Sequence, residues 1–241
     1  MKLSVFHTPE LVPTQDLADC AIAIDILRAT TTIVTALANG AEAIQVFADL
    51  ENLSQASALH PQHLRLRAAE RGGAKVEGYD LGNSPFDYAP EVVRGKRIFM
   101  STTNGTRALT QVQACSVVLA AAMVNLGAIV NYLKQTQPAR VWLVGSGWQG
   151  NYALEDTACA GAIVAALEGE PGAELANDEA YGAVALYQTW RDRLEQLFHH
   201  ASHGQRLLKL NCAADLTYAA TLDQFNVVPR QVAPGILQIL E

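Results

Sequence analysis

The chain has 241 residues, of which half are hydrophobic and 17% are charged. This composition is typical of a globular protein with a substantial core, and it excludes a disordered chain. The formal net charge of -7 argues against nucleic acid or an anionic membrane as a partner, so an anionic ligand would need a local cluster of donors.

The cysteines and the N-terminus indicate a compartment. The four cysteines lie far apart and form no C-x-x-C pair, which favours buried free thiols in a reducing environment. The N-terminal residues lack the apolar core of a signal peptide, and no apolar run reaches the roughly 18 residues of a membrane span. We therefore expect a cytoplasmic protein.

Short apolar runs alternate with longer alanine-rich segments along much of the chain. The apolar runs predict buried strands at 3–7, 20–27, 43–47, 97–101, 116–121 and 141–145. The alanine-rich segments predict helices at 29–39, 50–59, 106–113, 125–135 and 154–168. Because this alternation is typical of layered α/β folds, we predict a single domain over residues 1–241. Its architecture would be three-layer α/β/α with a largely parallel or mixed central sheet.

Two further segments differ from this pattern. Residues 71–94 are rich in Gly, Pro, Asp and Asn, which predicts a long ordered loop of the kind that often carries function. Residues 174–203 predict mainly helix. The alanine-rich helices fit packing inside one chain and packing across a homodimer equally well.

Polar residues follow three of the predicted strands at the point where a helix begins. These turns cover residues 25–32, 101–107 and 145–151. Ligands of open α/β sheets bind beyond the carboxyl ends of strands, where helix N-termini offer free N–H groups to phosphate. Each turn alone also fits an ordinary helix cap, but their recurrence favours one shared anion site.

Three acidic residues are candidates for chemistry. Asp25 ends an apolar strand, where a carboxylate is costly to bury unless it is paired or bound to a metal. In one alternative, Arg28 is only the structural ion-pair partner of Asp25. In the other, Asp25 is a nucleophile or Mg²⁺ ligand and Arg28 holds a phosphate. Glu155 and Asp156 begin an apolar helix, which fits dipole complementation or a hard-cation site with Asp25.

Two other patterns support no site. The histidine pairs 199/203 and 60/63 have helical spacing but no evident third ligand for zinc. The G-x-G-x-x-G string at 145–150 matches a dinucleotide fingerprint but lacks the acidic residue expected about 20 positions later.

Four motifs, taken in order, resemble those of the 2-phosphosulfolactate phosphatase family. They are DILRATTT at 25–32, EGYDLGNSP at 77–85, STTNGTR at 101–107 and EDTACAG at 155–161. The resemblance implies an α/β/α fold and a Mg²⁺-dependent phosphatase that converts 2-phospho-3-sulfolactate to 3-sulfolactate and phosphate, a step toward coenzyme M. The partner would be a small anionic substrate with phosphate and sulfonate groups.

The expected site consists of residues that match these motifs, together with Glu70 at the start of the long loop. The catalytic set is Asp25, Arg28 and Asp156. The substrate-binding set is Thr30, Thr31, Asn83, Ser84, Thr102, Thr103, Asn104, Gly105, Thr106 and Arg107. The metal ligands would be Asp25 and Asp156, joined by Glu155 or Glu70.

Several alternatives stay open. The nucleophile is either metal-bound water or Asp25 itself. The substrate is 2-phospho-3-sulfolactate or another small phospho-hydroxy acid. A protein that binds small phosphorylated or sulfonated acids without catalysis also fits the sequence.

Overall fold

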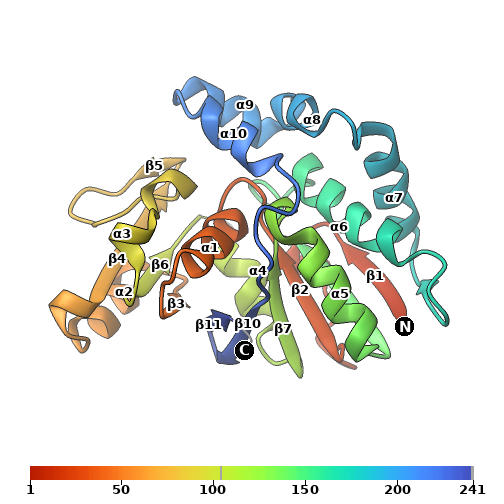
Figure 1. Ribbon diagram of the computed structural model, residues 1–241, viewed down its shortest axis with the longest axis horizontal. Coiled ribbons are helices and arrows are strands. Elements are labelled where there is room, and N and C mark those ends of the chain that lie inside the picture. Colours follow the sequence, from red (N-terminus) through yellow and green to blue (C-terminus); the bar gives the residue numbers. More distant parts are fainter. Residues whose placement is uncertain (104, 240–241) are drawn as a thin grey trace.

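A computed structural model gives the structure of residues 1–103 and 105–239, and its centre is one large sheet (Figure 1). The 11-stranded sheet has the order β5-β4-β6-β3-β11-β10-β7-β2-β8-β1-β9. The strands are β1 (Lys2–Phe6), β2 (Cys20–Ile24), β3 (Ala43–Val46), β4 (Arg65–Arg71), β5 (Ala74–Lys75), β6 (Arg97–Ser101), β7 (Val117–Ala121), β8 (Arg140–Gly145), β9 (Glu174–Leu175), β10 (Pro229–Ala233) and β11 (Ile236–Ile239).

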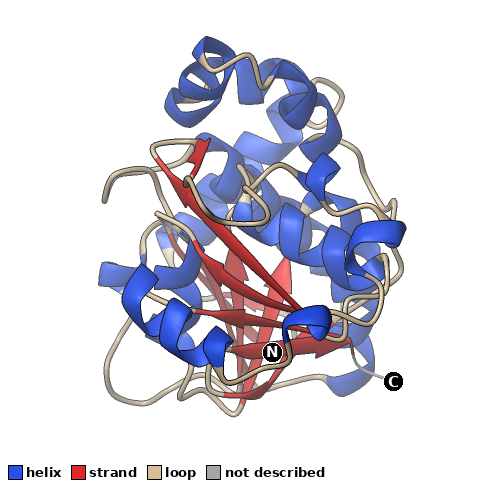
Figure 2. Ribbon diagram, turned by 90° about the vertical axis from the view of Figure 1, so that its left-hand side faces the viewer, coloured by secondary structure: helices blue, strands red, loops and turns tan. Residues whose placement is uncertain are grey.

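The sheet is mixed, as predicted. β4, β6 and β3 pair in parallel, and so do β7, β2, β8, β1 and β9. The antiparallel hairpin of β10 and β11 lies between these two groups. The strands fan out in the side view because neighbouring strands of a sheet twist relative to one another (Figure 2).

Helices cover both faces of the sheet. They are α1 (Ala29–Ala38), α2 (Leu50–Ala58), α3 (Pro90–Val93), α4 (Gly105–Val112), α5 (Leu126–Thr136), α6 (Leu154–Leu167), α7 (Asp178–Trp190), α8 (Leu194–His200), α9 (Ser202–Lys209) and α10 (Ala213–Ala219). Successive residues of a strand point to opposite faces. In β2, Ile22 and Ile24 therefore join the core beneath α5 and α6, whereas Ala21 and Ala23 join the core beneath α4. The predicted three-layer α/β/α architecture is confirmed.

Helices α8, α9 and α10 lie together beyond the end of β2 and the start of α1 (Figure 1). Leu207 of α9 and Leu216 of α10 are fully buried in the same core as β2. Burial of such side chains contributes roughly 1.5–3 kcal/mol each, so these helices are held firmly against the carboxyl end of β2.

Most predicted elements are confirmed to within a few residues. Residues 178–200 are largely helical, as expected, in α7 and α8. The segment 71–94 is irregular apart from β5, a 3-10 turn at Pro85–Asp87 and the short α3. β4 was not predicted because its sequence, RLRAAER, carries four charges and no apolar run.

The structure also bears on the expectations for the cysteines and for membrane-spanning helices. All four cysteines are free thiols, and Cys20, Cys115 and Cys159 are buried. Within residues 1–103 and 105–239, no helix has the length and apolar character needed to cross a membrane.

Candidate active site

Asp25 follows β2 directly and is nearly inaccessible, with 5% of its surface exposed. The backbone N–H of Ala29, in the first turn of α1, donates to Asp25 Oδ1 at 3.2 Å. Burial raises the pKa of Asp25 to about 7; the Ala29 N–H and Arg28 oppose this rise, and Glu70 adds to it. A carboxyl group of this kind exchanges its proton near neutral pH.

Glu155 and Asp156 bring two more carboxyl groups to Asp25 from the first turn of α6. Both are buried, with 2% and 3% of their surfaces exposed. Burial, with a smaller contribution from the Asp25 carboxylate, raises the pKa of Glu155 to about 7. Burial also raises the pKa of Asp156, with Glu155 and Asp25 adding to the effect. Because Asp25 acts on both Glu155 and Asp156, the three carboxyl groups form one electrostatic cluster.

Asp156 holds the ends of two strands together. Its Oδ1 accepts the backbone N–H of Ile26 at 2.9 Å, and its Oδ2 accepts those of Ser146 and Gly147 at 3.1 Å each. Both oxygens of a predicted metal ligand are thus occupied by backbone donors. The geometry supports a clamp between the ends of β2 and β8.

Glu70 plays a similar part at the other side of Asp25. Its Oε1 accepts the backbone N–H of Gly73 and the hydroxyl of Thr103, the latter at 3.2 Å. The backbone N–H of Thr103 donates to Oε2 at 3.3 Å. Glu70 therefore joins the β4–β5 turn to the end of β6, and its charge reaches Asp25.

Arg28 is buried and held by two partners. Its Nη1 donates to Asp215 Oδ2 at 2.5 Å, and its Nη2 donates to the carbonyl oxygen of Gly73 at 2.6 Å. Ser84 donates its hydroxyl to the other oxygen of Asp215 at 2.7 Å. The structure thus brings the predicted Arg28 and Ser84 together through a residue that the sequence analysis did not identify.

The threonines after β2 stabilise the turn. Thr30 Oγ1 donates to the carbonyl oxygen of Asp25, and Thr31 Oγ1 donates to that of Ile26, both at 2.9 Å. The backbone N–H of Asp25 in turn donates to Thr30 Oγ1 at 2.9 Å. These hydroxyls, predicted to bind substrate, act here as caps that fix the backbone around Asp25.

Only part of the predicted phosphate-binding turn at 101–107 lies with the residues around Asp25. Thr102 and Thr106 are buried, and Thr106 Oγ1 donates to the Thr102 carbonyl oxygen at 3.2 Å. Arg107 instead pairs with Glu10 on the surface, where 42% of its side chain is exposed. Gly105 begins α4, and Asn104 lies outside the described residues. The structure therefore does not bring Arg107 to Asp25, and its role in substrate binding stays a prediction.

Four buried polar atoms of the candidate site residues and their neighbours have no hydrogen-bond partner among the described residues. They are Arg28 Nε, Thr102 Oγ1, Ser146 Oγ and Asn83 Oδ1. An unpaired buried polar group costs about 1–3 kcal/mol, so each is a candidate contact for a ligand. Ser146 was not among the predicted site residues, although its turn at 145–151 was one of the three that the sequence analysis assigned to an anion site. In that turn, Gly145 leaves no room for a Cβ, which would lie 2.9 Å from the carbonyl oxygen of His7.

His203 covers Glu155 from α9. Its ring stacks on Trp148 with centroids 3.8 Å apart, and its Nδ1 lies 4.0 Å from Glu155 Oε1. Burial lowers the pKa of His203 to about 3, and Arg28 contributes in the same direction. The imidazole is therefore neutral at ordinary pH. It does not share a site with His199, which lies near Glu195.

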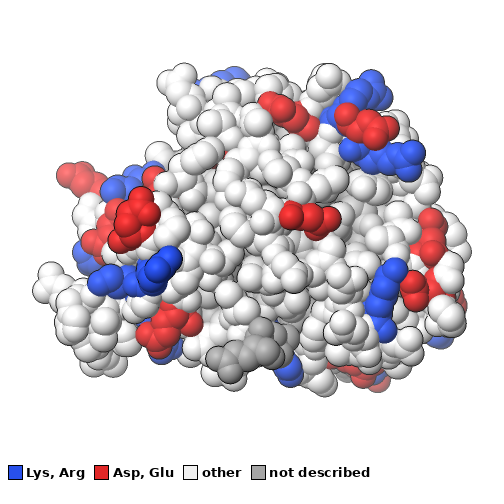
Figure 3. All heavy atoms as spheres, viewed as in Figure 1, with Lys and Arg blue, Asp and Glu red and all other residues white. Residues whose placement is uncertain are grey.

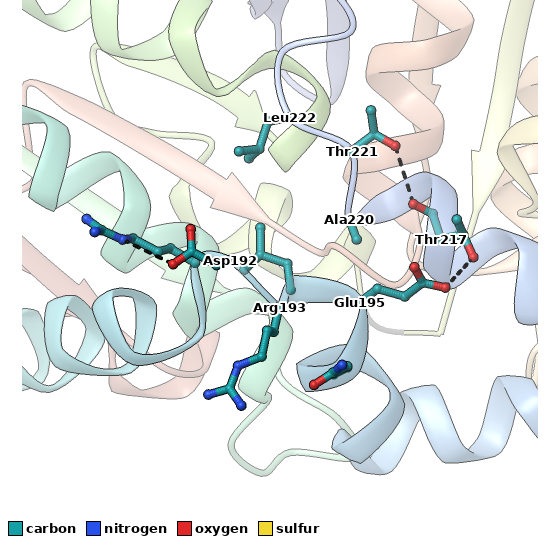
Figure 4. Close-up of a pocket in the computed structure, with 10 residues that line it drawn as sticks. Asp192, Arg193, Glu195, Thr217, Ala220, Thr221 and Leu222 are labelled. Carbon is teal, nitrogen blue, oxygen red and sulfur yellow. Dashed lines mark hydrogen bonds and ion pairs between the residues drawn. The ribbon is translucent and has the colours of Figure 1, made fainter.

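Two surface hollows flank the helices at the C-terminal end of the chain. One of about 230 Å³ is lined by Arg28, Gly73, Ala74, Lys75, Gly82, Asn83, Ser84, Asp87, Leu210 and Cys212. The other, of about 430 Å³, lies between α8 and the end of α10 (Figure 4). There, Glu195 accepts the Thr217 hydroxyl at 2.7 Å, and Arg191 pairs with Asp192 (Figure 4). The first hollow reaches Arg28, so it belongs to the candidate site.

On the face seen in Figure 3, basic and acidic side chains lie mainly toward the rim, and the basic ones do not merge into one patch. This face therefore offers no broad positive field to an anion.

Comparisons with known proteins match nearly the whole length of the chain. The family model described as 2-phosphosulpholactate phosphatase matches residues 6–234. A protein of Synechocystis sp. is 57% identical over 239 residues, which cover 98% of this chain and 99% of the relative. Proteins of Microcystis aeruginosa and Thermosynechococcus vestitus are each 56% identical, again over 98% of this chain and 99% of the relative. All three are named "Probable 2-phosphosulfolactate phosphatase". This chain therefore belongs to the 2-phosphosulfolactate phosphatase family, whose name denotes a phosphoric monoester hydrolase.

Proposed function

We propose that the protein is a Mg²⁺-dependent phosphomonoester hydrolase that converts 2-phospho-3-sulfolactate to 3-sulfolactate and phosphate, a step toward coenzyme M. The observation that carries this proposal is the buried carboxyl group of Asp25, set beside Glu155 and within the field of Arg28. The names of the relatives support the substrate.

The donor chemistry around Asp25 fits a hard divalent cation. Mg²⁺ prefers one or two protein carboxylates and completes its shell with water and phosphate oxygens. Burial raises the pKa of both Asp25 and Glu155, and Asp25 adds to the rise at Glu155, so a cation between them would favour both charged forms. Asp156 and Glu70 are occupied by backbone N–H groups, which makes Asp25 and Glu155 the better pair of ligands.

A site with only two carboxylate ligands is compatible with the arrangement of acidic side chains in the fold. Within residues 1–103 and 105–239, no group of three or more His, Cys, Asp and Glu side chains is arranged to hold a metal ion. Mg²⁺ bound by two carboxylates would neutralise charge on the phosphoryl oxygens and make the phosphorus more electrophilic.

The protein's own groups supply orientation and the reacting carboxylate. Arg28 offers a buried positive charge to the anionic substrate, and the hydroxyls of Thr102 and Ser146 are available as donors to phosphoryl oxygens. The Ala29 N–H holds Asp25 Oδ1, which leaves Oδ2 to react. Asp25 then either attacks phosphorus or accepts the proton of an attacking water.

The experiment that tests the proposal is an assay of phosphate release. The purified protein is incubated with a panel of phosphorylated hydroxy acids that includes 2-phospho-3-sulfolactate, with Mg²⁺ or with EDTA. We expect release that depends on Mg²⁺ and is fastest for 2-phospho-3-sulfolactate. Faster release from another acid would overturn the substrate; no release from any acid would overturn the hydrolase and favour a binding protein.

A further inference from the structure

Asp215 is a buried carboxylate that lies outside all four sequence motifs. It belongs to the short helix α10, and 3% of its surface is exposed. It forms an ion pair with Arg28 at 2.5 Å across 187 residues of sequence, and both side chains are 4% exposed. The Ser84 hydroxyl occupies its second oxygen at 2.7 Å.

These contacts join three distant segments at one point. Arg28 comes from the turn after β2, Ser84 from the segment before the 3-10 turn at Pro85–Asp87, and Asp215 from α10. Arg206 of α9 adds a contact nearby, where its Nη2 donates to the Gly72 carbonyl oxygen at 3.1 Å. The helices α9 and α10 are thus attached to the site through polar contacts in addition to their apolar core.

The geometry around Arg28 restricts its guanidinium group. Asp215 holds Nη1 and the Gly73 carbonyl oxygen holds Nη2, while Nε has no partner among the described residues. Arg28 also lines the hollow of about 230 Å³ beside Asn83 and Lys75. A planar guanidinium group whose two terminal nitrogens are both hydrogen-bonded presents its Nε edge in one fixed direction.

A purely structural role explains this arrangement less well. Burying an ion pair costs about as much desolvation energy as the attraction returns, so such a pair is weak evidence for stability. Its clearest effect is to fix one arrangement of Arg28, next to the carboxyl group of Asp25.

We propose that Asp215 is a positioning residue for the reaction, which holds Arg28 in the orientation that meets the anionic groups of the substrate. This inference rests on the proposed phosphatase function. Asp215 touches neither the reacting phosphorus nor the metal; it acts through the guanidinium group.

The test is a double-mutant cycle on phosphate release from 2-phospho-3-sulfolactate. Asp215→Asn keeps the shape of the side chain and removes its charge, and we expect kcat/KM to fall about 10- to 100-fold, the usual effect of a misplaced binding group. Asp215→Glu should restore part of the loss. The double variant Arg28→Gln/Asp215→Asn should be no slower than Arg28→Gln alone, because Asp215 acts only through Arg28.

Controls separate this role from folding. Asp192→Asn breaks an exposed Arg–Asp pair, and we expect it to leave kcat/KM unchanged. Where Asp215→Asn does not fold, Ser84→Ala removes the second bond to Asp215 and should lower kcat/KM about 3- to 10-fold. Losses that multiply in the double variant, or an Asp215→Asn protein as active as the wild type, would overturn the inference alone. A wild-type protein inactive on every phospho acid would overturn the proposed function and this inference with it.

Discussion

The carboxylate of Asp156 accepts the backbone N–H of Ile26 at 2.9 Å, although the two residues are 130 positions apart. The same carboxylate holds the N–H groups of Ser146 and Gly147. Because Ile26 follows Asp25 directly, this clamp fixes the backbone of the reactive carboxylate relative to the end of β8. Asp156, which the sequence predicts to be a metal ligand, thus accepts hydrogen bonds from the backbone of two strand ends.

Asp156→Ala should destabilise the fold strongly. It leaves the buried N–H groups of Ile26 and Gly147 without an acceptor, each at a cost of about 1–3 kcal/mol, whereas the Ser146 N–H keeps the Ile24 carbonyl oxygen at 2.8 Å. Relaxation of the turn recovers part of this cost. We expect a net loss of roughly 2–5 kcal/mol in the free energy of unfolding, measured by urea titration. The matched control is Asp49→Ala, which removes an exposed helix cap on Asn52 and should cost only about 1 kcal/mol. Equal losses in the two variants would contradict the clamp.

The metal-free protein should be more stable at pH 6.5 than at pH 8. Burial raises the pKa of Asp25 and of Glu155 to about 7, from unfolded values near 4, so the folded state binds more protons between these limits. Their contribution to stability is therefore lost as the pH rises through 7.

The pKa shift of His203 has the opposite effect on stability, and this effect is largest at lower pH. Burial lowers its pKa from 6.5 to about 3, so its contribution is lost as the pH falls below 6.5. Between pH 6.5 and 8 the carboxyl groups dominate. Thermal unfolding in EDTA tests this, with about 2–4 °C expected for each kcal/mol in a chain of this size. A midpoint that is higher at pH 8 would contradict the assignment, and Asp25→Asn should weaken the dependence.

Mg²⁺ binding should depend on Glu155 and only weakly on Glu70. Glu155→Gln removes one of the two carboxylates with the least competition from backbone donors, and we expect its Mg²⁺ affinity to fall at least about tenfold, equivalent to 1.4 kcal/mol. Affinity is read from the shift of the unfolding midpoint with Mg²⁺ concentration, which needs no activity. Glu70→Gln keeps the hydrogen bond from Gly73 and serves as the comparison. A larger loss in Glu70→Gln than in Glu155→Gln would reverse the assignment of the ligands.

The route of hydrolysis can be read from isotope transfer. If Asp25 attacks phosphorus, a single turnover in ¹⁸O water places the label on the Asp25 carboxylate when the acyl phosphate is hydrolysed by attack at the carbonyl carbon. Label in phosphate alone fits attack of water at phosphorus, either on the substrate or on the acyl phosphate. Label on the Asp25 peptide in mass spectrometry therefore shows attack by Asp25, with the Glu155 peptide as the internal control.

The sequence predicted the architecture well because hydrophobic period and helix boundaries are local properties. Alternating apolar runs and alanine-rich helices located β2, β8, α1 and α6 to within a few residues. The hairpin of β10 and β11 was not predicted, because its burial is partial and its pairing with β3 and β7 joins residues far apart in the chain.

The sequence predicted the site by residue type, and the structure adds the contacts that each residue makes. Asp25, Arg28, Glu155 and Asp156 do gather, as strand ends and helix starts indicate. Sequence does not distinguish a carboxylate that binds metal from one that accepts backbone N–H groups, so the part played by Asp156 emerged only in three dimensions. Asp215 gave no signal at all, because its importance comes from a contact across 187 residues.

The most direct test of the central claim is the activity of Asp25→Asn on 2-phospho-3-sulfolactate in the presence of Mg²⁺. Asparagine keeps the size of the side chain and cannot serve as the nucleophile or the base, so we expect kcat to fall by at least about 10²–10⁴-fold. Asp49→Asn, which alters an exposed carboxylate, should leave kcat unchanged. An Asp25→Asn protein that is folded and releases phosphate at the wild-type rate would contradict the account.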